Sequence, residues 1–215
     1  MKFLKNSTFK RFFVILILLF LFIFISALSY VEAVSKDIAN SVFRLHVIAN
    51  SDSSQDQALK LKVRDNLLSY MNTLAKNCSS KEEVIELAKV HEHDFKDLAE
   101  QTIIENGFDY SVTIQIGTSD FPTKTYGDIS FPAGTYDALR VQIGEAKGQN
   151  WWCVMFPPLC FVDVSSGIVP EESKQEIKES LNDEEYDLIS KTDNNEIHFK
   201  FKLIEFFQNF RLGQK

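Results

Sequence analysis

Residues 41–65 read SVFRLHVIANSDSSQDQALKLKVRD, and they decide the fold because they contain a strand pattern followed directly by a helix pattern. From residue 41 to residue 50 the side chains alternate, and one side of the alternation is wholly apolar: Phe43, Leu45, Val47 and Ala49. This period of two predicts a strand with its apolar face turned inward. The short polar run 50–54 offers side-chain oxygens to free backbone N–H groups, so we expect a helix to begin there, with Asp52 in its cap.

Two amphipathic helices are predicted after this strand. In residues 55–76 the apolar side chains fall three and four positions apart, and charged side chains occupy the other faces. The run Ser80–Glu83 is a capping box, which predicts a second helix that ends before Gly107. We expect the two helices to form a hairpin.

The second half of the chain is predicted to be rich in strands. Residues 110–116 alternate up to Gly117, and further strand patterns cover residues 123–129, 138–143 and 151–156, with residues 144–148 interpreted as a hairpin loop. Residues 171–189 have a helical composition with a break near Asn182, and residues 196–203 alternate again. The expected fold class is therefore α+β: a helical hairpin packed on a mostly antiparallel sheet, preceded by an N-terminal signal or anchor segment.

The N-terminal segment has the layout of an export signal. Four basic residues precede residues 12–25, which contain no polar side chain. Small residues at 27–29 and 31–33 provide two candidate cleavage sites, yet the apolar stretch also reaches the lower edge of the ~17–25 residues that span a bilayer as a helix. A cleaved signal and a retained anchor both stay open. We expect residues 1–29 to be that signal or anchor and residues 30–215 to form one extracytoplasmic domain, with its core motifs in residues 42–163.

The chain without this segment is acidic. Residues 1–29 contain four of the 23 Lys and Arg residues and none of the 30 Asp and Glu residues. Without them, 19 basic and 30 acidic residues remain, which gives a net charge of −11. This charge argues against nucleic-acid binding and against electrostatic adsorption to anionic lipid. Contact with a membrane is expected only through the N-terminal segment, if it is uncleaved.

Three cysteines remain, and two of them are close in sequence. Cys153 and Cys160 enclose a short loop with two prolines, and they are either joined by a disulfide, which an exported protein can keep, or present as two small buried apolar residues. Cys78 would be left over. The spacing of Cys153 and Cys160 does not fit the close cysteine pairs of a zinc site, and we expect no metal and no cofactor.

Three stretches resemble the stage II sporulation protein R family. They are FRLHVIANSD (43–52), which leads to LKLKVRD (59–65); FPAGTYDALRV (131–141); and GQNWWCVMFPPLCF (148–161). Their order, behind an N-terminal apolar segment, is similar to the family across residues 42–163. The resemblance implies a protein that is made in the forespore and exported into the space between the two membranes of the sporulation septum.

The resemblance also implies a partner and a role. A membrane-embedded aspartic protease senses the exported protein and then removes the pro-sequence of the mother-cell sigma factor. On this interpretation the chain is a protease activator and not an enzyme. The motif residues are then candidate partner contacts or scaffold positions: Arg44, His46, Asn50, Asp52, Lys62, Arg64, Asp65, Tyr136, Asp137, Arg140, Asn150, Trp151 and Trp152.

Several of these candidates have alternative interpretations. Arg44 and His46 share one strand face, where they should meet a helix or solvent. Trp151 and Trp152 should point to opposite sides of a strand, so either one ring is core and the other exposed or both pack in the core. The pairs Arg64 with Asp65, and Arg140 with Asp137, are interpreted either as ion pairs that fix helix against sheet or as partner contacts.

Two competing functions are carried forward. The first is an exported hydrolase acting on cell-wall or peptide substrates, motivated by His46, Asp52, Arg64 and Asp65, although the chain has no Gly-x-Ser-x-Gly sequence. The second is a passive envelope protein. A metal site at residues 91–94 is disfavoured, because helical residues two apart face away from each other.

Overall fold

Strand β1 (Phe43–Ile48) is a central strand of a four-stranded sheet in the computed structural model, which describes residues 7–160 and 169–190. The strand order is β2-β5-β1-β6, with β2 at Val112–Phe121, β5 at Gly134–Ile143 and β6 at Asn150–Phe156. β1 pairs parallel with β5 and antiparallel with β6, and β2 pairs antiparallel with β5. The expected α+β fold with a mostly antiparallel sheet is confirmed.

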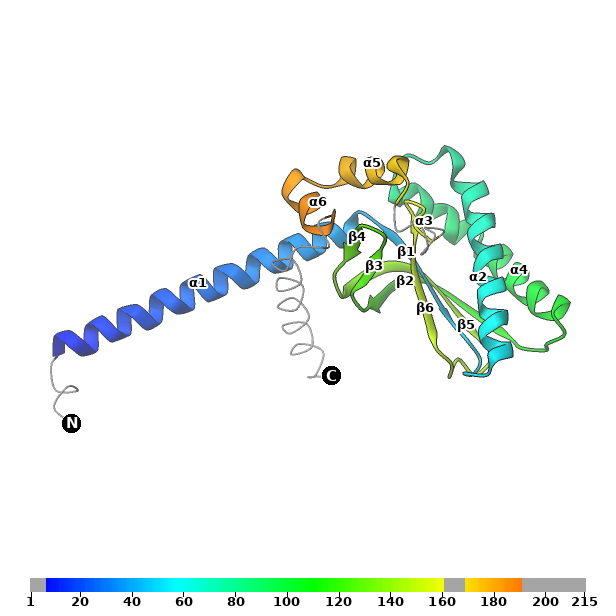
Figure 1. Cartoon of the computed structure of the whole chain (residues 1–215), viewed down its shortest axis with the longest axis horizontal. Coiled ribbons are helices and arrows are strands. Elements are labelled where there is room, and N and C mark those ends of the chain that lie inside the picture. The colour runs from blue at the N-terminus through cyan, green and yellow to red at the C-terminus, as the bar shows by residue number, and fades with distance from the viewer. Residues whose placement is uncertain (1–6, 161–168, 191–215) are drawn as a thin grey trace. The chain divides into compact units, whose positions relative to one another are not determined.

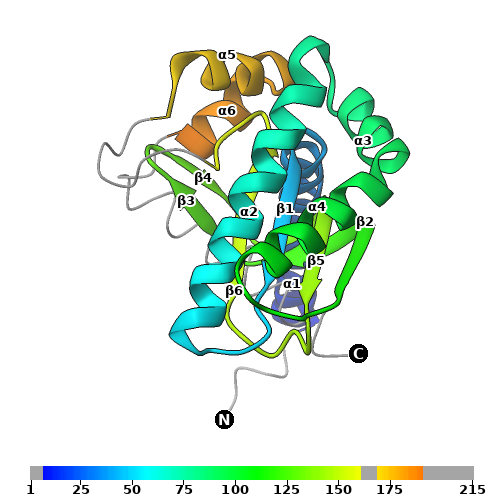
Figure 2. The same ribbon diagram turned by 90° about the vertical axis from the view of Figure 1, so that its right-hand side faces the viewer.

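One face of the sheet is covered by the helices α2 (Ser54–Leu74), α3 (Lys81–Val90) and α4 (Glu92–Glu105) (Figure 2). α2 begins where predicted, and the short 3-10 helix η2 (Ala75–Asn77) follows it. The buried stripe of α2 packs on the apolar side of β1. Together they form one core, with Phe43, Leu45 and Val47 from β1 and Leu59, Val63, Leu67 and Met71 from α2. The apolar side chains that recur every 3.6 residues in the helix therefore pack against those that recur every two residues in the strand.

The second predicted helix is two helices. α3 and α4 meet at His91, and Ser80 caps α3 by accepting a hydrogen bond from the backbone N–H of Glu83 at 3.3 Å. The His91 ring lies 3.1 Å from the Tyr70 hydroxyl and 2.6 Å from a carboxylate oxygen of Asp94. The apolar stripe continues across the break, which is why the sequence pattern did not predict it.

A two-stranded hairpin lies on the other side of the sheet from α2 and α4 (Figure 1). Its strands are β3 (Lys124–Tyr126) and β4 (Ile129–Phe131), so the single strand expected at 123–129 is wrong. Gly127 has a φ of 57° in the turn, a conformation that favours glycine. The end expected at Gly117 is wrong as well, because Gly117 pairs with Ala138 and β2 continues to Phe121.

The loop at 144–148 is not a hairpin loop, which corrects the sequence interpretation. β1 lies between β5 and β6, so the connection has to cross the end of β1. It is held there by backbone hydrogen bonds from Lys147 N to Asn50 O at 3.1 Å and from Gly148 N to Ala49 O at 2.9 Å.

By its internal contacts the chain divides into two units, residues 1–36 and 37–215. Helix α1 (Ser7–Asn40) contains the span Phe9–Ser26, which has a mean hydropathy of 2.5 and is long and apolar enough to cross a membrane. A signal sequence and an anchor both have these properties.

The acidic helical segment is interrupted as predicted, between α5 (Glu171–Ser180) and α6 (Asp183–Ser190). Asn182 Oδ1 accepts from the backbone N–H of Glu185 at 2.9 Å, and Glu185 Oε2 accepts from that of Asn182 at 3.0 Å. This reciprocal pair is a capping box. The strand expected at residues 196–203 lies outside the described residues.

Candidate functional site

The first and third motifs meet where the β5–β6 connection crosses the end of β1. Asn50 Oδ1 accepts a hydrogen bond from the backbone N–H of Glu145 at 3.0 Å, and Asp52 Oδ1 accepts one from that of Gln149 at 2.7 Å. The expectation that Asp52 caps the following helix is wrong, because Ser53 is the residue that caps it. Asn50 and Asp52 instead fasten one chain segment to another.

Asp56 lies beneath this crossing and was not among the predicted site residues. It is buried, and its Oδ2 accepts hydrogen bonds from Ser51 Oγ at 2.5 Å and from Asn50 Nδ2 at 2.9 Å. Burial raises the pKa of the Asp56 carboxyl, but its hydrogen bonds, those from Ser51 and Asn50 foremost, outweigh this and hold the pKa below its usual value. The signal in the sequence was an acid in the first turn after a run of short polar residues.

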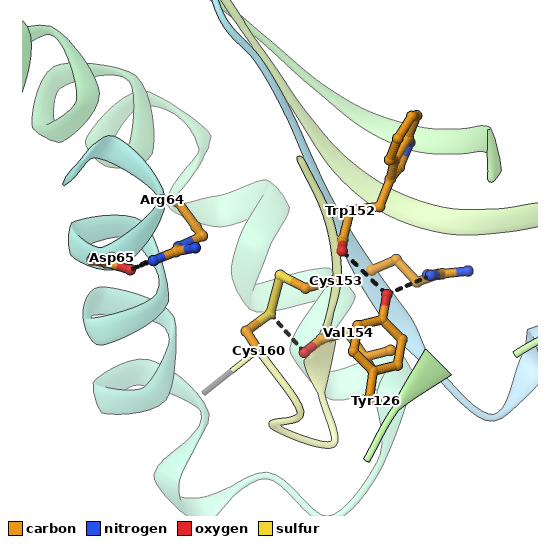
Figure 3. Close-up of a disulfide and its surroundings, with 8 residues drawn as sticks. Arg64, Asp65, Tyr126, Trp152, Cys153, Val154 and Cys160 are labelled. Atoms are coloured by element: carbon orange, nitrogen blue, oxygen red, sulfur yellow. Dashed lines mark hydrogen bonds and ion pairs between the residues drawn. A yellow bond between two sulfur atoms is a disulfide. The ribbon is translucent and has the colours of Figure 1, made fainter. Parts of the chain in front are cut away.

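On the helix side of the sheet, Arg64 links α2 to β6. Its guanidinium lies 4.2 Å from the centre of the Trp151 ring and 2.6 Å from a carboxylate oxygen of Asp65. Figure 3 shows this pair on α2 and, beside β6, the disulfide that joins Cys153 to Cys160 with a Cα–Cα distance of 5.2 Å. The stacked guanidinium thus connects helix to sheet, while its ion pair stays within the helix.

Arg44 is fully buried on the opposite side of the sheet, which corrects the expectation that it meets a helix or solvent. Its guanidinium carbon lies 4.0 Å from the Phe121 ring centre and 4.6 Å from that of Tyr136. Nη2 donates to the Tyr126 hydroxyl at 2.9 Å. The Tyr126 hydroxyl in turn donates to the backbone carbonyl of Trp152 at 3.2 Å (Figure 3). The β3–β4 hairpin supplies this cover, so an aromatic enclosure replaces solvent around the charge.

His46 faces the same side, two residues further along β1. Its ring stacks on Trp152 with ring centres 5.5 Å apart, and Nε2 donates to Asn150 Oδ1 at 2.8 Å. Burial lowers the pKa of His46, and the charges of Arg140 and Arg44 lower it further against the opposing effect of Asn150. Trp151 and Trp152 therefore point to opposite faces, and both rings are partly buried.

The remaining candidates contact residues other than those expected. Asp137 pairs with Lys81 of α3 at 2.7 Å, so the ion pair proposed with Arg140 is wrong. Residues 137 and 140 lie three apart on a strand and so face opposite sides of the sheet. Tyr136 is buried and donates to Pro132 O at 2.6 Å, and Lys62 donates to the side chain of Asn106.

The cluster that motivated a hydrolase is not brought together. His46 lies on the face opposite α2, while Arg64 and Asp65 are on α2 itself. The side-chain partners of His46 in the described part of the chain are Asn150, Trp152 and Phe121, none of which is a nucleophile. Within residues 7–160 and 169–190, no three His, Cys, Asp or Glu residues are grouped so that they could hold a metal ion.

Comparison with known proteins gives two consistent findings. The sequence profile of a family described as Stage II sporulation protein R matches residues 39–166. A curated relative, Stage II sporulation protein R of Bacillus subtilis (strain 168), is 40% identical over 143 residues, which is 66% of this chain and 63% of the relative. The chain thus spans less than two thirds of that relative's length. No solved structure matches the chain.

Proposed function

Because the chain belongs to the stage II sporulation protein R family, we propose that it acts in sporulation as an exported signal. In this proposal the domain after α1 stands outside the cytoplasm and binds a membrane-embedded aspartic protease of the sporulation septum. Binding activates the protease, which then removes the pro-sequence of the mother-cell sigma factor. The observation that carries the proposal is the family match over residues 39–166, which covers all three sequence motifs.

Two features of the structure support this function. The apolar span Phe9–Ser26 has the length and hydropathy of a segment that directs export or anchors a protein. The motif residues form hydrogen bonds and stacking contacts that hold the sheet, the β5–β6 connection and the β3–β4 hairpin in place. A rigid domain of this kind suits a signal, which needs only a higher affinity for the active state of its receptor.

Co-expression in a non-sporulating host tests the proposal. The full chain and a version without residues 1–29 are each produced with the candidate protease and its pro-sigma substrate, and cleavage is followed by immunoblot. We expect cleavage that requires both the chain and its N-terminal segment. Absence of cleavage with the full chain, when all three proteins are present in the membrane fraction, would reject protease activation.

A His46→Ala variant separates the proposal from the hydrolase alternative in the same assay. His46 packs on Trp152 and has no nucleophile beside it, so we expect the variant to keep signalling if the protein still folds. Loss of signalling by a folded variant would bring the hydrolase hypothesis forward. A passive envelope protein would leave sigma-factor processing intact after deletion of the gene.

A further inference from the structure

The face of the sheet opposite the helices is covered at one end and open at the other. Near the β3–β4 hairpin, Arg44 and Tyr136 are fully buried. Further along the strands, Arg140 on β5 is partly exposed, and Gln115 on β2 and Asn150 on β6 are exposed. The four-stranded floor therefore continues from the aromatic enclosure with exposed side chains on β2 and β6 and a partly exposed one on β5.

Two positive charges, those of Lys124 and Arg140, lie on this open part beside His46 and Trp152. His46 is directly opposite Arg140 in the parallel pairing and opposite Trp152 in the antiparallel pairing. Lys124 of β3 places its ammonium 4.8 Å from the centre of the Trp152 ring. We call Lys124, His46, Arg140 and Trp152 the basic face.

Among the described residues, Lys124 and Arg140 lack the acidic partners that several other cations of this protein have. Lys81 pairs with Asp137 at 2.7 Å and Lys174 with Asp128 at 2.7 Å. In the described part of the chain, no Asp or Glu forms an ion pair with any member of the basic face. In a chain with a net charge of −7, Lys124 and Arg140 are thus two cations that no described acidic side chain pairs with.

The basic face also holds polar atoms without partners. Arg140 Nε, Trp152 Nε1 and His46 Nδ1 are buried and have no hydrogen bond to any residue that the structure describes. Two of these atoms, on Arg140 and Trp152, are obligate donors. Buried donors are nearly always hydrogen-bonded in folded proteins, so the grouping of unpaired ones here is a feature that contacts among the described residues do not account for.

The shape beside Arg140 leaves room for such an acceptor. Gly117, Ser119 and Ala138 carry small or no side chains, and with Arg140 they line a hollow of about 420 Å³. Glu92, Ile114 and Ile116 line the same hollow. The hollow borders β2, which among the described strands lies at the end of the sheet and pairs with β5.

We propose that the basic face binds an acidic, extended segment of a partner protein, with carboxylates that contact Arg140 in the hollow and Lys124 beside Trp152. A guanidinium donates in a fork that fits a carboxylate, and the Trp152 ring packs against the methylene groups of the same side chain. The proposal rests on the proposed function, to which it adds the chemistry of the partner surface. The acidic remainder of the chain repels long polyanions, which favours a short acidic peptide over nucleic acid.

Fluorescence anisotropy with the full-length chain in detergent micelles tests this site. The probes are a fluorescein-labelled peptide of four Thr-Glu repeats with a blocked C-terminus and the same peptide with Gln for Glu. We expect binding of the Glu peptide alone, and a loss of affinity of about tenfold in Arg140→Gln and in Lys124→Gln. Lys76→Gln removes a positive charge from an exposed position on η2 and should leave affinity unchanged.

Four outcomes would overturn the proposal. They are equal binding of both peptides, unchanged affinity in both folded variants, displacement of the peptide by inorganic phosphate at equal concentration, and a dimeric chain that Arg140→Gln makes monomeric. The third would assign the face to a phosphate group and the fourth to a second copy of the chain. Near-UV circular dichroism checks folding, and the two variants sit on different strands, so one misfolded variant leaves the other informative. The protease is absent from this assay, so failure of peptide binding and failure of protease activation are separate results.

Discussion

Replacement of Gly148 by alanine should loosen the β5–β6 connection from the end of β1. A Cβ at Gly148 would overlap the backbone carbonyl of Ser51, and that carbonyl cannot rotate away as a flexible side chain could. Four backbone N–H groups of residues 145–149 donate to residues 49–52, and a shift of the connection weakens all of them. At about 0.5–1.5 kcal/mol net for each bond, partial loss should lower the free energy of unfolding by about 3 kcal/mol.

Urea unfolding of the full-length chain in mild detergent measures this change through the near-UV circular dichroism of the two tryptophans. Gly117→Ala is the matched control, because a Cβ there meets no atom within 4 Å and its φ is ordinary for an L-residue. We expect the control to change the free energy of unfolding by less than about 1 kcal/mol, in the stabilising direction. A Gly148→Ala protein as stable as its Gly117→Ala counterpart would refute the argument that this crossing requires a close backbone approach.

Three further predictions use the same unfolding assay. Reduction of the Cys153–Cys160 disulfide opens a short loop and should lower the free energy of unfolding by about 2.5 kcal/mol. The Cys78→Ala variant keeps the disulfide, so reduction should lower its free energy of unfolding by the same amount. A free energy of unfolding that reduction leaves unchanged would contradict this prediction. Asp56→Ala leaves two partly buried donors unpaired and should cost about 1–3 kcal/mol, whereas Asp65→Ala, which removes a half-exposed carboxylate, should cost under ~1 kcal/mol. Burial holds the pKa of His46 below its unfolded value, so the unfolded chain binds the proton more readily and stability should fall as the pH drops through about 6.5. His46→Gln should remove that part of the slope, and an NMR titration that places the pKa of His46 above 6.5 would reverse its sign.

The local elements could be predicted from the sequence because their signals are local. The alternation in residues 41–50 and the capping run at Ser80 each specify a structure from neighbouring residues alone. The break at Asn182 belongs to the same class, since an Asn and a Glu three residues apart complete their own capping box. Such signals also identified the fold class, which follows from the order of elements.

The pairing of strands could not be predicted in the same way. Residues 144–148 have the composition of a hairpin turn, and only the insertion of β1 between β5 and β6 makes them a crossing instead. Arg44 is a similar case, because a charged residue in an alternating strand suggests a side chain that is exposed to solvent. The hairpin that buries it contributes Tyr126, which is 82 positions away in sequence. Asp137 likewise had a plausible neighbour in Arg140, but its partner Lys81 comes from a distant helix.

The central place of β1 determines the order in which the domain can form. During synthesis β1 appears first, but its two neighbours in the sheet follow much later, since Arg44 is flanked by Ala138 and Val154. Both edges of β1 therefore remain without a strand while β2, β3 and β4 are also made, and of the described elements the helices α2, α3 and α4 and the β3–β4 hairpin can form in that interval. Because the last pairing waits for β6, a chain truncated before residue 150 would lack one side of its central strand. Completion of the sheet thus coincides with the arrival of the third motif, and this domain should fold late and in a single cooperative step.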